Sequence, residues 1–288
     1  RRDGQGEGHG RCRQSHLGRG RGGKPRAAAR LREGLFERID PAAIGDEKNF
    51  VPGTLSECGV ATYVWSMVMA YNGAKVAKAP QSWADFWNTA EYPGKRGLRK
   101  GAKYTLEIAL LADGVKQEDI YKVLGTKEGV DRAFAKLDQL KGNIQWWEAG
   151  AQPPQWLAAG DVVMSAAYNG RIAAAQKEGV KLGIVWPGSL YDPEYWAVVK
   201  GTPNKALAEK FIAFASQPQT QKTFSENIPY GPVHKGTLDL LPADVRDALP
   251  TAPATSRRPL GGRGLLGRPR RRAGTALQRL GRSLISLS

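Results

Sequence analysis

The sequence is poor in the residues on which most catalytic and metal-site chemistry depends. Its 288 residues include two cysteines, Cys12 and Cys58, and of three histidines only His234 lies between residues 34 and 255. Two cysteines do not make up a disulfide framework, and no run of residues has metal-ligand spacing. No glycine pattern of a nucleophile elbow is present either. We therefore expect no enzyme activity, no cofactor and no metal.

Long apolar runs are also missing. The longest, Val60–Ala70, has 11 residues, which is the size of a buried core segment and too short to cross a bilayer. The N-terminus is charged but lacks the apolar region of a secretory signal. A soluble chain without a visible export signal is expected, and Val60–Ala70 is expected to form a buried strand.

Both ends lack aromatic residues, and the C-terminal end also lacks acids. Residues 1–33 carry a net charge of +7 and residues 256–288 carry +9, which accounts for the whole charge of +16. All 24 aromatic residues lie between Phe36 and Tyr230. Such Arg/Gly-rich ends cannot bury enough surface to offset their ordering entropy, so disordered basic tails are expected. The abrupt composition shifts favour out-of-frame translation at both ends over genuine basic tails.

The leader contains a phosphate-loop lookalike, Gly18–Pro25. Pro25 stands where the motif needs a hydroxyl residue, and no apolar strand precedes it, so the match is discarded. A nucleic-acid-binding protein that acts through its basic tails is the alternative function. The tails offer no aromatic side chains to stack on bases.

Residues 34–255 predict an α/β fold. Helical and strand-like segments alternate from Tyr104 to Trp186, with glycines after the helices, which indicates an open, mostly parallel sheet covered by helices on both faces. One expected helix begins at Ser82. The others include residues 106–110, 120–124, 130–137, 153–159, 171–178, 205–214 and 218–228. The expected strands are 144–147, 162–168, 182–186 and 196–199. Leu207, Phe211 and Phe214 recur at helical spacing and predict a buried face.

Ligands of such sheets bind beyond the carboxyl ends of the strands. Trp147, Tyr168 and an expected loop at Tyr191–Glu194 all fall there. A basic cluster at Lys95–Lys103 is interpreted as a solvated loop, with a docking surface as the alternative.

Several motifs resemble the polyamine (spermidine/putrescine) type of solute-binding protein from bacterial ABC transporters. They occur in the order and at spacings compatible with that family and span roughly Gly34 to Pro253. The motifs are SECGV (56–60), SWADFW (82–87), YPGKRGL (92–98), LEIALLADGV (106–115), YNGR (168–171) and the run from Trp196 to Val233.

This resemblance implies a periplasmic-binding-protein-like type II fold, in which two lobes close on a ligand about a hinge. Residues 74–196 would form the second lobe, and residues 34–73 with 197–255 a first lobe whose opening αβ units are missing. Apolar faces such as Val60–Ala70 would then lie uncovered. The resemblance also implies that Cys58 lacks its usual disulfide partner.

The resemblance further implies a site that holds an ammonium group between carboxylates and aromatic faces. Glu194 falls where relatives have an amine-binding aspartate, Tyr168 where they have a stacking tryptophan, and Tyr230 where they have a cleft tyrosine. Asp192 replaces an aromatic residue of many relatives, and Tyr104 replaces an acid of some. The candidate ligand-binding residues are thus Glu194, Tyr168, Tyr230, Asp192, Trp147 and Tyr104. For Trp147 and Tyr168, a place in the core is the alternative, and for Glu194 the alternative is a solvated carboxylate.

The implied function is capture of a small cationic solute of the putrescine or spermidine class for an ABC importer. The implied partners are that solute and the permease subunits of the transporter, with no nucleic acid. A periplasmic monomer is expected.

Overall fold

The computed structural model describes residues 34–57 and 59–252. The predictions for the leader, the C-terminal tail and both cysteines concern residues outside these ranges. Within them, the strands lie in one six-stranded sheet, and no helix is long and apolar enough to cross a membrane.

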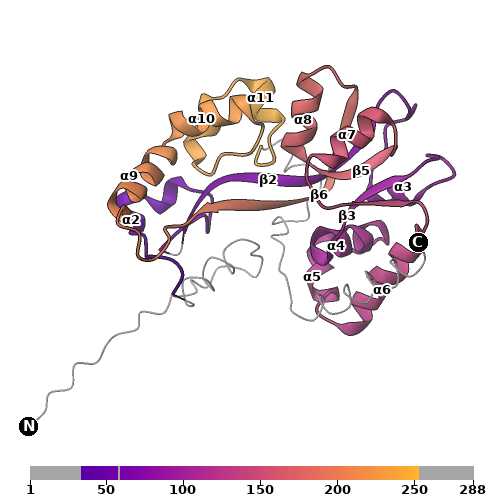
Figure 1. Cartoon of the computed structure of the whole chain (residues 1–288), viewed down its shortest axis with the longest axis horizontal. Coiled ribbons are helices and arrows are strands. Elements are labelled where there is room, and N and C mark those ends of the chain that lie inside the picture. The colour runs from indigo at the N-terminus through magenta and orange to yellow at the C-terminus, as the bar shows by residue number, and fades with distance from the viewer. Residues whose placement is uncertain (1–33, 58, 253–288) are drawn as a thin grey trace, which may run out of the picture.

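The two longest strands pair to form an antiparallel ribbon. Strand β2 (Gly59–Asn72) pairs along its length with β6 (Leu182–Trp196), and the two run side by side across the view in Figure 1. The apolar run Val60–Ala70 lies within β2, and both its end residues are fully buried, so the predicted strand is confirmed. The expectation that this run lies uncovered is wrong, because the partner strand and the packed helices cover it.

Strand β6 is longer than the sequence predicts. The strand predicted at 182–186 continues past Pro187 to Trp196, with an irregularity in its pairing between the Met67–Leu190 and Met69–Val185 pairs. A proline is tolerated in a strand at a bulge, where its missing N–H costs no ladder hydrogen bond. The expected loop at Tyr191–Glu194 is therefore wrong, since these residues belong to the strand. The separate strand expected at 196–199 is also absent from the described residues.

The sheet is mixed rather than mostly parallel. Its order is β1-β2-β5-β3-β4, with β6 on β2, and the strands not yet given are β1 (Leu55–Ser56), β3 (Arg96–Arg99), β4 (Ile144–Trp147) and β5 (Met164–Tyr168). Only the β5–β3 and β3–β4 pairs are parallel, and β2 is antiparallel to each of its three neighbours. The αβ alternation predicts the parallel part correctly, but it contains no information on the long ribbon.

The helices surround this sheet and mostly match the expected segments. They are α2 (Pro41–Ile44), α3 (Trp83–Trp87), α4 (Ala102–Ala112), α5 (Ile120–Val123), α6 (Lys127–Asp138), α7 (Gln152–Ala159), α8 (Asn169–Lys177), α9 (Lys205–Ala215), α10 (Pro218–Asn227) and α11 (Ala243–Asp247). Short 3-10 helices span Glu47–Asn49, Gln117–Asp119 and Lys235–Leu240. In Figure 1, α9 and α2 lie at one end of the ribbon, and α3 and α4 lie toward the other.

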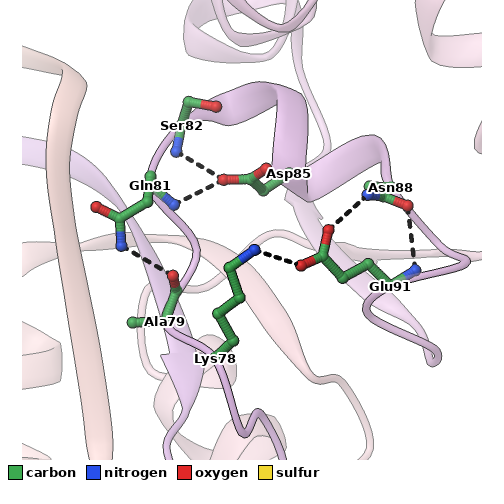
Figure 2. Close-up of polar contacts among 7 residues, drawn as sticks. All are labelled: Lys78, Ala79, Gln81, Ser82, Asp85, Asn88 and Glu91. Atoms are coloured by element: carbon green, nitrogen blue, oxygen red, sulfur yellow. Dashed lines mark hydrogen bonds and ion pairs between the residues drawn. The ribbon is translucent and has the colours of Figure 1, made fainter.

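The start of α3 shows how a local cap holds a core helix in place. Figure 2 shows the carboxylate of Asp85 accepting the backbone N–H groups of Gln81 (2.7 Å) and Ser82 (3.1 Å), and Glu91 pairing with Lys78 (2.8 Å). These bonds satisfy backbone donors that a helix start leaves unpaired. Helix α3 then buries Phe86, with no exposed surface, in the largest core cluster. The helix predicted to begin at Ser82 is confirmed.

The basic cluster that follows α3 is not a solvated loop. Arg96 to Arg99 form β3, and Arg96 is fully buried. Its guanidinium donates to the carbonyl oxygens of Phe86 (2.8 Å) and Gly94 (2.6 Å), while burial lowers its pKa to about 10. Arg96 thus ties the end of the α3 segment to the sheet.

The predicted buried face of α9 is exposed. Leu207, Phe211 and Phe214 are 65%, 50% and 63% exposed, whereas Ile212 is the buried residue of this helix. The helical period was correct, but the assumption that this face has a covering partner was wrong within the described residues.

Candidate ligand-binding site

One face of the β2–β6 ribbon brings acids and aromatic side chains together. In the antiparallel register, Trp65 lies opposite Asp192 and Tyr63 lies opposite Glu194. Alternate residues of a strand point to the same face, so these four side chains share one side of the ribbon. Pairing between two segments more than a hundred residues apart creates this arrangement.

Asp192 is the most constrained acid of the site. It is 4% exposed, accepts a hydrogen bond from the Tyr104 hydroxyl at 2.9 Å, and forms an ion pair with Lys103 through the same oxygen, Oδ2. Its other oxygen, Oδ1, is buried and has no hydrogen-bond partner among the described residues. A buried carboxylate oxygen without a partner is costly, and Oδ1 therefore keeps its capacity to accept a hydrogen bond.

The start of α4 aims Lys103 and Tyr104 at that acid. Lys103 (ψ 130°) and Tyr104 (φ 72°) both depart from helical geometry, and Tyr104 is the one non-glycine residue with positive φ in the described chain. A bulky residue in the left-handed region costs about 1–3 kcal/mol, so the surrounding contacts must hold it there. Burial, followed by the charge of Asp192, raises the pKa of Tyr104, so its hydroxyl stays a hydrogen-bond donor.

Glu107 lies one turn further along α4 and is fully buried. Burial raises its pKa to about 7, while hydrogen bonds from the backbone of Glu107 and Tyr104 and the charge of Lys103 act against that rise. The Tyr121 hydroxyl donates to Oε1 at 3.4 Å, and Oε2 has no partner among the described residues. Glu107 thus helps to hold the unusual turn that presents Lys103 and Tyr104.

Aromatic rings surround the Asp192 group. Trp65 meets Tyr104 edge-on at 5.4 Å between centroids and meets Tyr168 edge-on at 4.8 Å. Tyr168 also meets Trp147 edge-on at 5.5 Å. Trp147 is fully buried, which supports its reading as a core residue, whereas Trp65 and Tyr168 are half-buried. Partly open rings beside a carboxylate are the components that hold an ammonium group and its methylenes.

Tyr230 joins this group from the C-terminal part of the chain. It stacks on Tyr63 at 4.8 Å, and a Cβ atom on Gly170 would lie 2.5 Å from its ring. Glycine is therefore required where α8 begins. Burial and Tyr63 raise the pKa of Tyr230, and the positive charge of Arg171 opposes the rise, which places Arg171 near the ring.

Asn169 connects the two aromatic groups. Its side-chain oxygen accepts the backbone N–H of Ser66 at 2.9 Å, and its amide donates to the carbonyl of Pro229 at 2.7 Å. It is 1% exposed. This residue therefore fixes Tyr168, its neighbour in sequence, relative to Tyr230.

The six sequence-predicted residues thus fall in one region with unequal roles. Asp192 and Tyr104 are hydrogen-bonded to each other, and Tyr168 and Trp147 extend the aromatic wall. Glu194, expected to be the main acid, is exposed and lies near Tyr230. Sequence reasoning missed Lys103, Arg171 and Asn169 as members of the group. The YNGR motif contained the signal for two of them, and the position beside Tyr104 was the signal for the third.

Comparisons with known proteins show the family and the fold of the chain. Residues 25–252 match the family model of the bacterial extracellular solute-binding proteins. Over 222 residues the chain is 86% identical to a gamma-aminobutyric acid-binding protein of Pseudomonas aeruginosa, covering 77% of this chain. The chain spans 63% of that relative's length.

Solved structures give the same answer for the fold. The Atu4243-GABA receptor superposes with a TM-score of 0.70 at 35% identity, over 80% of this chain and 70% of the other. A spermidine/putrescine ABC transporter substrate-binding protein of Streptococcus pneumoniae gives 0.73 at 18% identity, over 90% of this chain and 80% of the other, which bears on the fold alone. These likenesses confirm the periplasmic-binding-protein-like fold, and these relatives are binding proteins rather than enzymes. The chain belongs to the bacterial extracellular solute-binding protein family.

Proposed function

We propose that the chain is the substrate-binding component of a bacterial ABC importer and that it captures a short amino acid with a terminal amine, of which gamma-aminobutyric acid (GABA) is the simplest candidate. The observation that carries this proposal is Oδ1 of Asp192, a buried acceptor without a partner beside half-buried rings. The two relatives that bind GABA supply the candidate solute. A periplasmic location and transporter permease subunits as partners belong to the same proposal, and a monomer remains the expected state.

The ammonium end of the solute would lie on Asp192. A charge-assisted hydrogen bond to a desolvated carboxylate is among the stronger polar contacts available to a protein. Trp65 and Tyr168 offer ring surface to the methylenes and to the cation. The Tyr104 hydroxyl holds the carboxylate in position through its 2.9 Å bond.

The carboxylate end needs a positive partner, and Arg171 is the candidate. It lies in the first turn of α8, is exposed, and its charge opposes the rise that burial causes in the pKa of Tyr230. Backbone N–H groups and the helix dipole add positive character at this end of α8. Asn169 links this turn to β2 and to Pro229, so the two ends of the proposed site are held by one buried amide.

The charge balance favours an amino acid over a polyamine. Asp192 and Glu194 carry negative charge, and Lys103 and Arg171 carry positive charge, so this group of four is neutral. A zwitterion leaves it neutral, whereas putrescine would add two positive charges to a group in which Asp192 is already paired. An amino acid therefore replaces the polyamine that the resemblance implied as the proposed solute.

A panel of four solutes tests the proposal on the full chain. Titration calorimetry should show binding of GABA and much weaker binding of 1-butylamine, butyrate and putrescine. Butylamine lacks the carboxylate, butyrate lacks the amine, and putrescine has a second positive charge in place of the carboxylate. Equal affinity for GABA and putrescine would contradict the amino-acid proposal. No heat with any of the four would contradict capture of this class of solute.

A further inference from the structure

The ion pair between Lys103 and Asp192 differs from every other ion pair of the described residues in its burial. The side chain of Asp192 is 5% exposed, whereas the acids of the other nine pairs are 22% to 70% exposed. Lys103 itself is 29% exposed, so its ammonium reaches into the site from the solvent side. Most surface pairs contribute little to stability, but a charge fixed on a buried carboxylate acts on whatever binds there.

The backbone determines where this ammonium lies. Lys103 and Tyr104 leave helical geometry at the start of α4, and Tyr104 has φ 72°. The Lys103 ammonium lies 4.7 Å from the centroid of the Tyr104 ring. The lysine therefore rests on the ring of the residue whose hydroxyl holds the same carboxylate oxygen.

We propose that Lys103 is a specificity-determining residue that makes the site select solutes carrying both an amine and a carboxylate over simple amines and diamines. The proposal rests on the function proposed above and assigns its charge selectivity to one side chain. The tethered ammonium takes Oδ2 of Asp192 and leaves Oδ1 for the solute.

The physical reason is the closeness of two positive charges. A solute ammonium on Oδ1 lies within a few ångströms of the lysine ammonium on Oδ2, and at that separation like charges repel strongly in a partly buried site. A carboxylate on the same solute offsets this repulsion by interacting with Lys103 or Arg171. A monoamine has no such group, and a diamine adds a further positive charge. Lys103 therefore penalises amines without a carboxylate.

The test measures a ratio of affinities rather than one affinity. Titration calorimetry on the full chain compares GABA with 1-butylamine in wild type, Lys103→Met and Lys103→Gln. The ratio of the GABA affinity to the butylamine affinity should fall by about tenfold or more in both variants, with butylamine bound more tightly than by wild type. Lys103→Arg keeps the charge and should keep the ratio within about threefold.

Lys100→Met is the matched control. Lys100 lies three residues earlier and pairs with Glu148, an acid that is 70% exposed. This variant loses the same charge from the same segment, so long-range electrostatics change equally, but the ratio should stay at the wild-type value. Thermal melting of each variant verifies folding, and Lys103→Gln keeps the test available if the methionine variant does not fold.

Two outcomes would overturn the proposal. An unchanged ratio in Lys103→Met and Lys103→Gln would show that Lys103 does not set selectivity. If that unchanged ratio comes with equal gains in affinity for GABA and butylamine, the lysine only competes for Asp192. If the wild-type chain binds butylamine and GABA with equal affinity, both this proposal and the amino-acid function are contradicted. If the wild type prefers GABA and the variants keep the same affinity ratio, this proposal alone is contradicted.

Discussion

Two regions of the molecule bury their apolar side chains to very different extents. Every well-exposed large apolar residue of the described chain is Leu35 or lies between 196 and 240, and none lies between 74 and 195. Helices α6 and α9 show this difference in the exposure of their apolar side chains. Both carry apolar residues at i, i+4 and i+7, yet Leu137 of α6 is 7% exposed whereas Phe214 of α9 is 63% exposed.

The presence of an apolar face on a helix does not by itself show that the face is buried. The spacing of residues along a helix determines which side chains share a face. Whether another element covers the face depends on the rest of the fold. The largest core cluster, which includes Met67 and Met69 of β2, provides that cover for residues 74–195, and the α9 face lacks it within the described residues. The division into two lobes at these positions remains a prediction.

The largest expected difference comes from matched leucine truncations in the two regions. Leu110 of α4 is fully buried and Leu207 of α9 is 65% exposed. Leu110→Ala should lower the free energy of unfolding by about 2–5 kcal/mol because it leaves a cavity, and Leu207→Ala should change it by less than about 0.5 kcal/mol. Urea titration of both variants measures the pair. Comparable losses would mean that the α9 face is covered in solution.

The buried carboxyl of Glu107 gives the well-covered region a pH-dependent stability. Its folded pKa of about 7 exceeds its usual value, so the folded state holds the proton more tightly than the unfolded state. Stability from this group is present below about pH 4.5 and falls as pH rises to about 7, by about 3 kcal/mol in total.

Glu107→Gln should remove this contribution to the pH dependence. The variant should match wild type near pH 4.5 and be more stable at pH 8, as measured by urea unfolding at a series of pH values. Glu148→Gln changes a 70% exposed acid and is the control. Identical pH profiles for wild type and Glu107→Gln would show that the folded pKa of Glu107 is not raised.

Gly170 tests the contact between the two regions. An added Cβ would lie 2.5 Å from the Tyr230 ring, whereas at Gly236 the nearest atom would be 3.4 Å away. Gly170→Ala should cost about 1–3 kcal/mol of stability through overpacking and should weaken GABA binding, and Gly236→Ala should do neither. Chemical unfolding and calorimetry measure the two effects. Wild-type behaviour of Gly170→Ala would mean that Tyr230 does not pack on α8.

The smallest expected effect on stability belongs to the exposed face of α9. Phe214→Ser removes apolar surface that is already in water, so the free energy of unfolding should change by less than about 0.5 kcal/mol. The same substitution should reduce concentration-dependent self-association, because exposed apolar patches drive it. Light scattering at rising protein concentration measures this. A large loss of stability would again indicate that the face is covered.

The sequence predicted candidate residues that lie together in the structure, but not how deeply each one is buried. The six predicted residues fall in one region because strand ends and a family-like pattern mark them. The burial of Asp192 and the exposure of Glu194 could not be predicted, because Lys103 and Tyr104 at the start of α4 contact only Asp192 of the two acids. The role of Lys103 was hidden for the same reason, since its partner lies 89 residues away.

The fold was predictable where local signals dominate. Glycine stops, the cap at Asp85 and helical periodicity placed most helices and the parallel strands. The strand predicted at 182–186 was too short, because pairing with the long strand β2 carries β6 on to Trp196. The burial of Arg96 was equally unpredictable, since the carbonyl groups that satisfy it come from the fold around α3.

The most direct test of the central claim compares the two acids of the ribbon. Asp192→Asn and Glu194→Gln each remove one negative charge, and calorimetry with GABA measures both, with thermal melting as the check on folding. The account predicts that Asp192→Asn weakens binding by about 2–3 kcal/mol, because it removes a charge-assisted bond in a buried position. Glu194→Gln, at an exposed position, should weaken it by less than about 1 kcal/mol. The reverse order would contradict the assignment of Asp192 as the acid that holds the solute's amine.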